Sequence, residues 1–359
     1  LADLGVDVIK VEPPGGDPAR GLGPFENDDP HPERSLYWWA NNANKRGITL
    51  DVRSGDGQAL FRKLVKTADF VIESYQPGYL DGLGLGYTSL RGLNPRLVFT
   101  SITPFGQEGA YRSYKATDLT LMAMSSFMLL LGEPDRPPVR VTLPQSYLWT
   151  SAYAAIGTMT AHYHRLKTGE GQYVDVSAQA ATAWASAYAP YFWDAIQANP
   201  KLAGDRMTGR SHKDPEATYP ATYPCKDGYI AFPLYSGRAG AVSNKALVEW
   251  MDEQGLAPPE LKEKDWEEFD QFQATQAEYD QITGPISRFF LGVTKRDFYR
   301  EAVRRRIMGY PVSTAKDILE DPQLEARRFW ERVEHSEAGE GLAFPGPFAK
   351  FSVTPLTFR

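Results

Sequence analysis

Residues 142–176 read TLPQSYLWTSAYAAIGTMTAHYHRLKTGEGQYVDV, and the rest of the chain is organised around this stretch. From Leu148 to Lys167, small and apolar residues recur at helical spacing, which predicts a buried helix. The expected inner face comprises Ala152, Ala155, Ile156, Met159, Tyr163 and Leu166. Residues 168–171, Thr-Gly-Glu-Gly, predict the helix end, because glycine readily adopts the left-handed cap conformation. In residues 172–177 apolar and polar side chains alternate, which predicts a short strand. Any chemistry is expected just ahead of the predicted helix of residues 148–167, because the amides at a helix N-terminus are free to bind a ligand.

Length and composition narrow the class of protein. A chain of 359 residues can bury a large core and form more than one domain. No apolar run reaches the roughly 20 residues of a membrane span, and the start resembles no signal peptide, so no membrane partner is expected. The single cysteine, Cys225, excludes an intrachain disulfide and favours a reducing, cytoplasmic location. A net charge of -6 argues against nucleic acid as a partner.

The order of elements predicts an α/β fold. Strand-like segments at residues 7–12, 47–52, 70–73 and 97–102 alternate with helical segments, a pattern typical of a doubly wound parallel sheet. Ligands of such sheets gather at the carboxyl ends of the strands. The composition changes after Pro200, which predicts a large domain over 1–199, a smaller, mostly helical α+β domain over 200–310, and a return to the large domain over 311–359.

Three local patterns are candidates for functional sites. The glycines of residues 82–86, Gly-Leu-Gly-Leu-Gly, follow a turn and lack the spacing of a dinucleotide-binding loop. His162 and His164 lie two apart on a helix and face different sides, so no metal site is expected. Asp118 precedes an apolar helix, where an aspartate serves either as a helix cap or as a functional carboxylate. Both interpretations of Asp118 stay open from the sequence.

Seven segments together carry a family resemblance. In chain order they read LADLGVDVIKVEPPGGD (1–17), NKRGITLD (44–51), ADFVIESYQPG (68–78), NPRLV (94–98), SITPFGQEG (101–109), RLKTGEGQYVDVS (165–177) and DPQLEAR (321–327). On these segments the chain resembles the family III CoA-transferases, also called the CaiB–BaiF family. The resemblance implies coenzyme A, as acyl-CoA, and a carboxylic acid as substrates. It also implies two ring-shaped protomers interlocked into a dimer, with the small domain lying between two parts of the large one in sequence.

The start of the chain departs from the family pattern. The chain begins at Leu1 without a methionine, and its first residues look like the last turn of a helix, so we expect a truncated start. Family members usually open with a strand and a Gly-Pro turn that contacts CoA, and neither is present in the sequence printed here.

The resemblance also places a CoA site. Leu50 and Arg53 match positions that hold the adenine and the nucleotide phosphates, and Ser74 and Tyr75 match a pair that lines the same groove. Lys115 matches a lysine beside the CoA. Cationic Arg53 and Lys115 facing phosphate oxygens are the expected chemistry for such a site.

The catalytic position departs from the family as well. Members that transfer CoA use an Asp carboxylate as the nucleophile, and an ungapped count back from Thr168 places Tyr147 at that position. Nothing acidic lies between Pro138 and Ala161. Racemases of the superfamily use a His and an Asp, and the His position falls on Thr117, so racemisation is disfavoured.

Two functions of different classes follow. The first is an enzyme acting on an acyl-CoA and carboxylic acid pair, with Tyr147 in place of the Asp and chemistry drawn from Asp118 or another residue. The second is a non-catalytic subunit of a heteromeric CoA-transferase, whose Asp-bearing paralogue supplies the nucleophile. The corresponding assemblies are a homodimer or a heterodimer, and the acyl group cannot be identified from the sequence.

Overall fold

The computed structural model describes residues 1–356 except 201, 210, 334–340 and 347. The chain divides into two compact units. Unit 1 contains Leu1–Phe127, Val141–Tyr188 and Asp317–Arg359, and unit 2 contains Met128–Arg140 and Ala189–Lys316. Both chain ends thus belong to unit 1. The domain limits expected from the sequence, after residues 199 and 310, stay a prediction.

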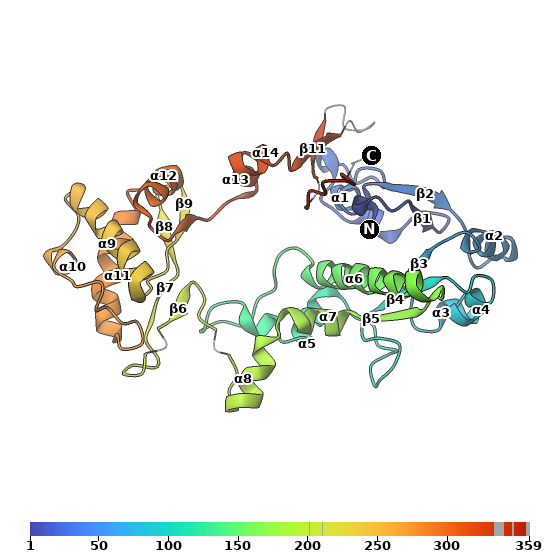
Figure 1. Cartoon of the computed structure of the whole chain (residues 1–359), viewed down its shortest axis with the longest axis horizontal. Helices are drawn as coiled ribbons and strands as arrows, with labels where there is room; N and C mark the ends of the chain where they lie inside the picture. Colours follow the sequence, from blue (N-terminus) through green and yellow to red (C-terminus); the bar gives the residue numbers. More distant parts are fainter. Residues whose placement is uncertain (201, 210, 334–340, 347, 357–359) are drawn as a thin grey trace. The chain divides into compact units, whose positions relative to one another are not determined.

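Unit 1 is a mixed α/β structure (Figure 1). Its strands are β1 (Val8–Glu12), β2 (Lys45–Thr49), β3 (Phe70–Glu73), β4 (Val98–Thr103), β5 (Tyr173–Ser177), β11 (Trp330–Val333) and β12 (Leu342–Pro345). Its helices are α1 (Leu36–Asn42), α2 (Gly55–Val65), α3 (Tyr79–Gly82), α4 (Tyr87–Arg91), α5 (Asp118–Met124), α6 (Gln145–Thr168), α7 (Ala178–Ala185) and α14 (Pro322–Ala326). Helix α13 (Ala315–Leu319) lies at the passage from unit 2 back to unit 1.

The strands of unit 1 pair in three separate sheets. Strand β1 pairs with β2 in parallel, and β3, β4 and β5 form a second parallel sheet with β4 in the middle. Strands β11 and β12 form an antiparallel pair. The sequence predicts one doubly wound sheet, whereas the parallel strands form two. Central β4 is the most buried strand because both of its edges are paired and α6 packs against it.

Helix α6 forms over the predicted residues, but the prediction of its inner face is wrong. Ile156 is 60% exposed and Leu166 is 64% exposed, and most of the expected inner face likewise lies at the surface. The residues that are buried instead are Ser146, Thr150, Ala154, Thr158, Ala161 and Arg165. Helix α6 therefore packs on β4, β5 and α7 through small and polar side chains.

Hydrogen bonds within the helix make this polar face compatible with burial. The Thr158 hydroxyl donates to the Ala154 carbonyl at 2.7 Å and also lies 2.7 Å from the hydroxyl of Thr100 on β4. Thr150 bonds the Ser146 carbonyl in the same way. A buried hydroxyl costs little once it is hydrogen-bonded, so these residues can replace apolar ones.

Near its C-terminus, α6 is fastened to the sheet by the buried Arg165. The guanidinium, 3% exposed, donates to the carbonyls of Asp69 at 2.9 Å and Arg96 at 3.2 Å, and it pairs with the Asp69 carboxylate at 2.9 Å. It also lies over the ring of Phe70. Asp69 and Arg96 precede β3 and β4, so Arg165 ties α6 to the amino ends of two neighbouring strands.

The turn from α6 to β5 is set by two glycines with different roles. Gly169 adopts the left-handed conformation (φ 82°) of the expected cap and bonds back to the Arg165 carbonyl. Gly171 is needed for space, because a Cβ there would lie 2.0 Å from the Leu97 carbonyl oxygen. The backbone therefore passes close to the residues that precede β4.

Unit 2 is built from helices around a small antiparallel sheet. Its strands are β6 (Arg206–Thr208), β7 (Thr218–Pro220), β8 (Thr222–Cys225), β9 (Gly228–Ala231) and β10 (Tyr310–Pro311), with β6–β7 paired separately from β10–β9–β8. Its helices are α8 (Tyr188–Ile196, whose first residue belongs to unit 1), α9 (Gly237–Glu253), α10 (Pro259–Lys262), α11 (Gln276–Phe290) and α12 (Lys295–Arg305). An aromatic core with Tyr223, Phe232 and Phe290 joins α9, α10, α11 and α12 to β7, β8 and β9.

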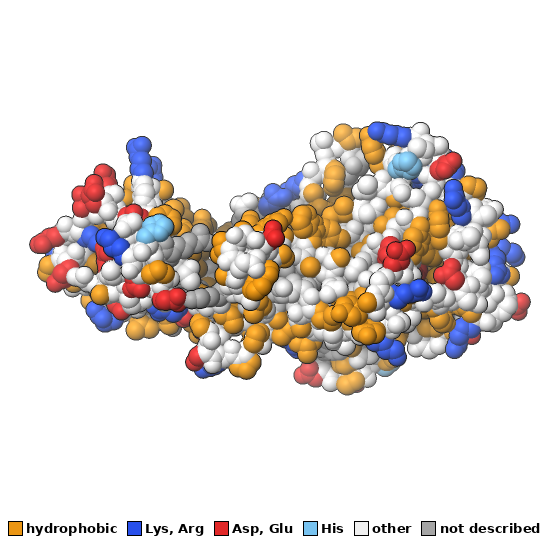
Figure 2. Space-filling view, turned by 90° about the horizontal axis from the view of Figure 1, so that it is seen from below, with side chains coloured by type: hydrophobic (Ala, Val, Ile, Leu, Met, Phe, Trp, Pro, Cys, Tyr) orange, Lys and Arg blue, Asp and Glu red, His pale blue; other side chains and the backbone are white. Residues whose placement is uncertain are grey.

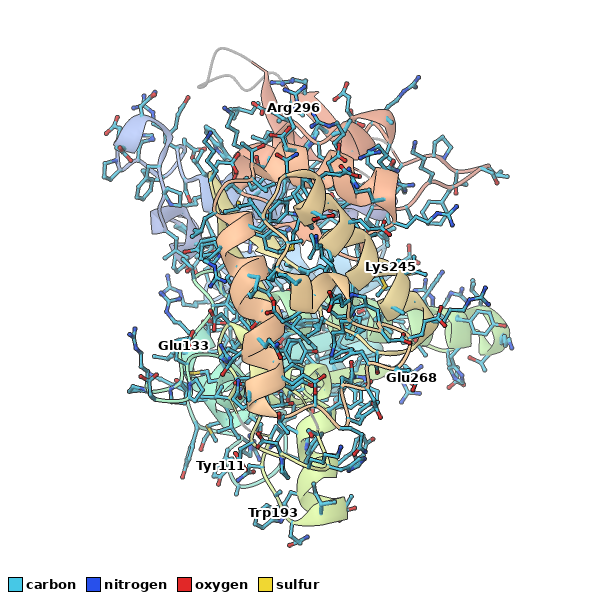
Figure 3. The ribbon with its side chains drawn as sticks, turned by 90° about the vertical axis from the view of Figure 1, so that its left-hand side faces the viewer. Tyr111, Glu133, Trp193, Lys245, Glu268 and Arg296 are labelled. Atoms are coloured by element: carbon cyan, nitrogen blue, oxygen red, sulfur yellow. The ribbon has the colours of Figure 1, made fainter. Side chains whose placement is uncertain are left out.

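The outer surface of unit 2 is rich in charge of both signs (Figure 2). Lys245 on α9, with Glu268 and Arg296, illustrates these outward-facing side chains (Figure 3). Within the described parts of the chain, no helix is long and apolar enough to cross a membrane.

We expect Gly171→Ala to lower the free energy of unfolding by about 1–3 kcal/mol, because the added methyl overlaps the backbone of Leu97. Chemical unfolding followed by circular dichroism measures this change. Gly55→Ala is the matched control, since a Cβ at this first residue of α2 meets nothing within 4 Å. Equal stability of the two variants would contradict the close approach at Gly171.

Candidate functional site: the meeting of two helix N-termini and a strand-end groove

Helices α5 and α6 cap one another where their N-termini meet. The Asp118 carboxylate accepts hydrogen bonds from the Ser146 amide at 2.9 Å and the Ser146 hydroxyl at 2.7 Å. In return, the Asp118 amide donates to the Tyr147 hydroxyl at 3.0 Å. Free amides at a helix N-terminus need acceptors, and each helix here supplies one to the other.

Asp118 is thus a helix cap, but of a different helix from the one expected. The N-cap of α5 is Thr117, which forms a capping box with Thr120, and Asp118 is the first residue inside α5. Its carboxylate is 9% exposed and lies at the N-terminus of the 24-residue α6. An anionic carboxylate is favourable there because the helix dipole is positive at that end.

Tyr147 lies in this junction with a second tyrosine. Its side chain is 42% exposed, and its oxygen accepts the amide of Asp118. Burial raises the pKa of the Tyr37 phenol on α1, and the neighbouring Tyr147 and Asp118 raise it further. Tyr37 therefore lies within electrostatic range of this junction. The sequence places it only in an aromatic cluster, and nothing in its spacing singles it out.

The predicted CoA residues lie at the carboxyl ends of β2 and β3. Leu50 and Arg53 directly follow β2, and Ser74 and Tyr75 follow β3. Lys115 lies in the exposed segment between β4 and α5. Within the part of the chain that the structure describes, no direct hydrogen bond or ring contact joins these five residues to one another.

Tyr79 connects the two strand ends and was missed from the sequence. Its ring stacks on Tyr75 with the centroids 4.7 Å apart, and its phenol is close enough to Arg53 to contribute to that group's raised pKa. The larger cause of that rise is Asp51, which pairs with Arg53 at 2.9 Å. Both rings are about two-fifths exposed and offer an aromatic surface beside a guanidinium.

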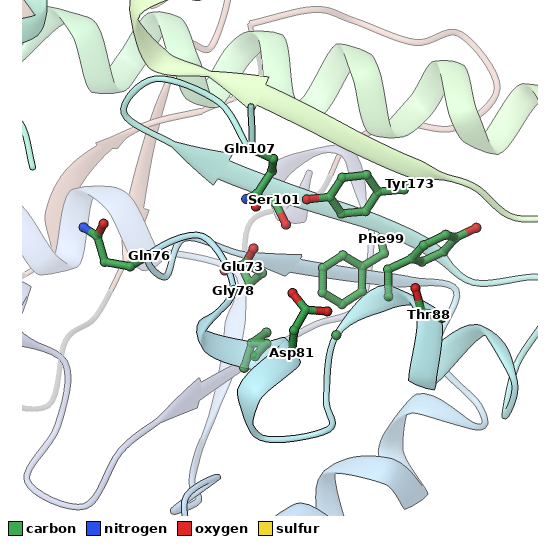
Figure 4. A pocket seen from close by; sticks show the side chains of 12 residues that line it. Glu73, Gln76, Gly78, Asp81, Thr88, Phe99, Ser101, Gln107 and Tyr173 are labelled. Atoms are coloured by element: carbon green, nitrogen blue, oxygen red, sulfur yellow. The ribbon is translucent and has the colours of Figure 1, made fainter. Parts of the chain in front are cut away.

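A cavity of about 210 Å³ adjoins this edge (Figure 4). Its walls come from the end of β3, from β4 and β5, and from α3 and α4, and they include Glu73, Asp81, Ser101 and Tyr173. Burial raises the pKa of the Glu73 carboxyl, although hydrogen bonds from Ser101 and from the Tyr75 amide act in the opposite direction. The cavity is lined both by hydrogen-bond acceptors and by apolar side chains.

The described residues contain no group of three or more His, Cys, Asp or Glu side chains placed to hold a metal ion. Unit 1 offers two features. One is a capped helix junction with a carboxylate and two phenols. The other is an exposed groove edge with cationic and aromatic side chains.

Comparison with known proteins shows which family the chain belongs to. The model described as CoA-transferase family III matches residues 1–359. The chain is 37% identical to the succinyl-CoA:(R)-benzylsuccinate CoA-transferase subunit BbsE of Thauera aromatica, over 96% of this chain and 82% of that protein. It is 32% identical to the succinate–glutarate CoA-transferase of Agrobacterium fabrum, over 100% of this chain and 86% of that protein.

A solved structure agrees with these sequence matches. A CAIB/BAIF family protein from Brucella suis superposes with a TM-score of 0.76 at 30% identity, covering 96% of this chain and 89% of that one. The resemblance expected from the seven sequence segments is therefore confirmed, and this chain belongs to the family III CoA-transferases.

Proposed function

We propose that this chain is the non-nucleophilic subunit of a heteromeric CoA-transferase that moves CoA from succinyl-CoA to a carboxylic acid. The family supports an acyl-CoA and acid pair as substrates. The name of the Thauera relative supports succinyl-CoA as the donor and calls that protein a subunit, and the name of the Agrobacterium relative pairs succinate with glutarate. The proposed assembly is the interlocked dimer predicted from the family resemblance, formed with an Asp-bearing paralogue.

The observation that carries the proposal is the engagement of Tyr147 with Asp118. A tyrosine phenol is a poor nucleophile toward a thioester in comparison with a free carboxylate. Its oxygen already accepts the Asp118 amide, and Oδ1 of Asp118 already accepts two hydrogen bonds from Ser146. Both groups thus have structural partners at the place where a free carboxylate would be required.

The second candidate is an enzyme that works alone with Asp118 as its carboxylate. One observation favours it: Asp118 directly contacts the residue that stands in for the family aspartate. The two candidates differ in one chemical respect. Only the second forms a covalent acyl intermediate on this chain.

CoA is proposed to lie along the carboxyl ends of β2 and β3. Arg53 and Asp51 form an ion pair that is largely exposed, and such pairs are weak because water and salt screen them. Arg53 can therefore exchange Asp51 for a phosphate oxygen at little cost. The stacked Tyr75 and Tyr79 offer a ring surface to the adenine, and Lys115 adds a second cation.

We expect hydroxylamine trapping to leave this chain unmodified. The chain is incubated with succinyl-CoA and hydroxylamine, alone and with the paralogue, and peptides are read by mass spectrometry. An acyl-Asp intermediate would yield a hydroxamate on the carboxylate that carried it, and we expect that hydroxamate on the paralogue only.

Asp118→Asn provides the control for this experiment. If the proposal holds, the hydroxamate on the paralogue persists with this variant, because Asn still accepts hydrogen bonds from Ser146. A hydroxamate on Asp118 of the wild-type chain would instead establish the second candidate.

We expect Arg53→Ala and Lys115→Ala each to weaken CoA binding by about 10- to 100-fold, the usual loss for a charge-assisted contact. Isothermal titration calorimetry with CoA measures the change. Arg46→Ala is the matched control, because Arg46 is also 67% exposed and also paired with an aspartate, but lies at the amino-terminal half of β2. CoA affinity that is unchanged in both test variants would remove this placement.

A further inference from the structure

Glu73 is a carboxylate whose position the proposed function does not explain. It is the last residue of β3, and its partly buried side chain forms part of the cavity wall at that strand end (Figure 4). The residues that line the cavity, all within the described part of the chain, include no Lys, Arg or His. A carboxylate removed from water without a counter-charge is unfavourable unless hydrogen bonds compensate it. The hydrogen bonds of Glu73 therefore indicate its role.

One of these hydrogen bonds fixes the residue two positions further along the chain. The Tyr75 amide donates to Oε2 of Glu73 at 2.7 Å, a distance typical of a charge-assisted hydrogen bond. A side chain that accepts the amide two residues later restricts the backbone between the two residues. Glu73 therefore limits the directions in which Tyr75 can leave the end of β3.

Tyr75 in turn forms a ring pair with Tyr79. The two rings are stacked, with their centroids 4.7 Å apart and their planes inclined by 26°. The Tyr79 amide donates to the Gln76 carbonyl at 3.0 Å, so the backbone between the two rings is also closed into a turn. The rings are 41% and 39% exposed. The turn that Glu73 anchors thus presents two nearly parallel rings at the carboxyl end of β3.

The neighbouring strand holds Glu73 itself. Glu73 is in register with Ser101 on the central strand β4, and Ser101 is only 2% exposed. The Ser101 hydroxyl is a hydrogen-bond partner of the Glu73 carboxylate and also of the Tyr173 phenol on β5. A chain of contacts therefore runs from the buried centre of the sheet through Glu73 to the exposed Tyr75.

We propose that Glu73 is a positioning residue for CoA, whose carboxylate holds the Tyr75–Tyr79 ring pair in the orientation that stacks on the adenine. This inference rests on the proposed placement of CoA along the ends of β2 and β3. It adds a residue that acts on the ligand through Tyr75 and does not touch it. Stacking between a ring and a base requires the two planes to lie parallel and in contact, so a displaced ring pair binds CoA less tightly.

The role depends on pH, because it needs the carboxylate in its charged form. Burial raises the pKa of Glu73, hydrogen bonds from Ser101 and the Tyr75 amide act against this, and Asp81 on α3 raises it further, with a net rise above the ordinary value. The other titratable groups that face Glu73 are the phenols of Tyr75 and Tyr173, whose pKa burial also raises, so they stay neutral. Protonation of Glu73 weakens the acceptor of the Tyr75 amide. Tight CoA binding is therefore present above the raised pKa of Glu73 and is lost as the pH falls through it.

The test is calorimetric titration of CoA into the wild-type chain, Glu73→Ala and Glu73→Gln. We expect Glu73→Ala to weaken CoA binding by about 10-fold near neutral pH, because the Tyr75 amide loses its acceptor. Glu73→Gln retains an acceptor oxygen and should bind CoA nearly as well as the wild type at that pH. Glu170→Gln is the matched control, since Glu170 is 70% exposed in the turn before β5, at the amino end of the same sheet, and it should leave the affinity unchanged.

The pH profile separates positioning from a general effect on the fold. CoA itself titrates, because a phosphate monoester has a second pKa near ~6, so the affinities of wild type and Glu73→Gln are compared as a ratio at each pH. The wild type should lose affinity relative to Glu73→Gln as the pH is lowered from about 7.5 to about 5, across the range above the ordinary pKa of a glutamate. The profile of Glu170→Gln should follow the wild type. Circular dichroism at each pH verifies that all variants are folded.

The outcomes distinguish this inference from the CoA placement on which it rests. A ratio that does not change with pH, or wild-type affinity in Glu73→Ala, would overturn the role of Glu73 while Arg53→Ala still weakens binding. Affinity that is unchanged in Arg53→Ala and Lys115→Ala would remove the CoA placement and this inference with it. If Glu73→Ala does not fold, the pH-dependent ratio of wild type to Glu73→Gln decides alone.

Discussion

The carboxylate of Asp118 at the N-terminus of α6 is the contact on which the candidate site depends. It satisfies the amide of Ser146, and the neighbouring Tyr147 satisfies the amide of Asp118 in return. Because α6 packs on β4, β5 and α7, fixing its first turn also fixes the position of α5 relative to the sheet. A site built on two helix ends needs such a bond, since each end otherwise carries unpaired donors.

The sequence predicted the extent of α6 well and its orientation badly, for a physical reason. Helical spacing of apolar residues shows that they share one side of the helix, but it does not show which side packs on the sheet. Ile156 and Tyr163 are therefore predicted in the core, whereas Thr158 and Arg165 occupy it. Polar residues could take that place because each finds a nearby carbonyl, a circumstance that hydrophobicity patterns do not record.

The candidate site was predictable where short motifs mark strand ends. Arg53 and Tyr75 lie in the segments that follow β2 and β3, as a family match and the rule for parallel strands imply. Tyr79 and Tyr37 were not predicted, because their contribution comes from stacking and from electrostatic proximity across elements. For Asp118 the sequence left a helix cap and a functional carboxylate both open, and the Ser146 amide that its carboxylate binds lies 28 positions away, where only the tertiary structure identifies it.

The buried Arg165 gives the sheet two edges with different tolerance for change. At the amino ends of β3 and β4, the Arg165 guanidinium binds two carbonyls and a carboxylate, so substitutions there lower the stability of the fold. At the carboxyl ends, Arg53, Ser74 and Tyr75 are exposed and support little of the core. Substitutions can therefore accumulate at one edge while the other edge preserves the fold. In the proposed heteromer, a chain without the nucleophile still folds, because the contacts that hold the fold lie at the other edge.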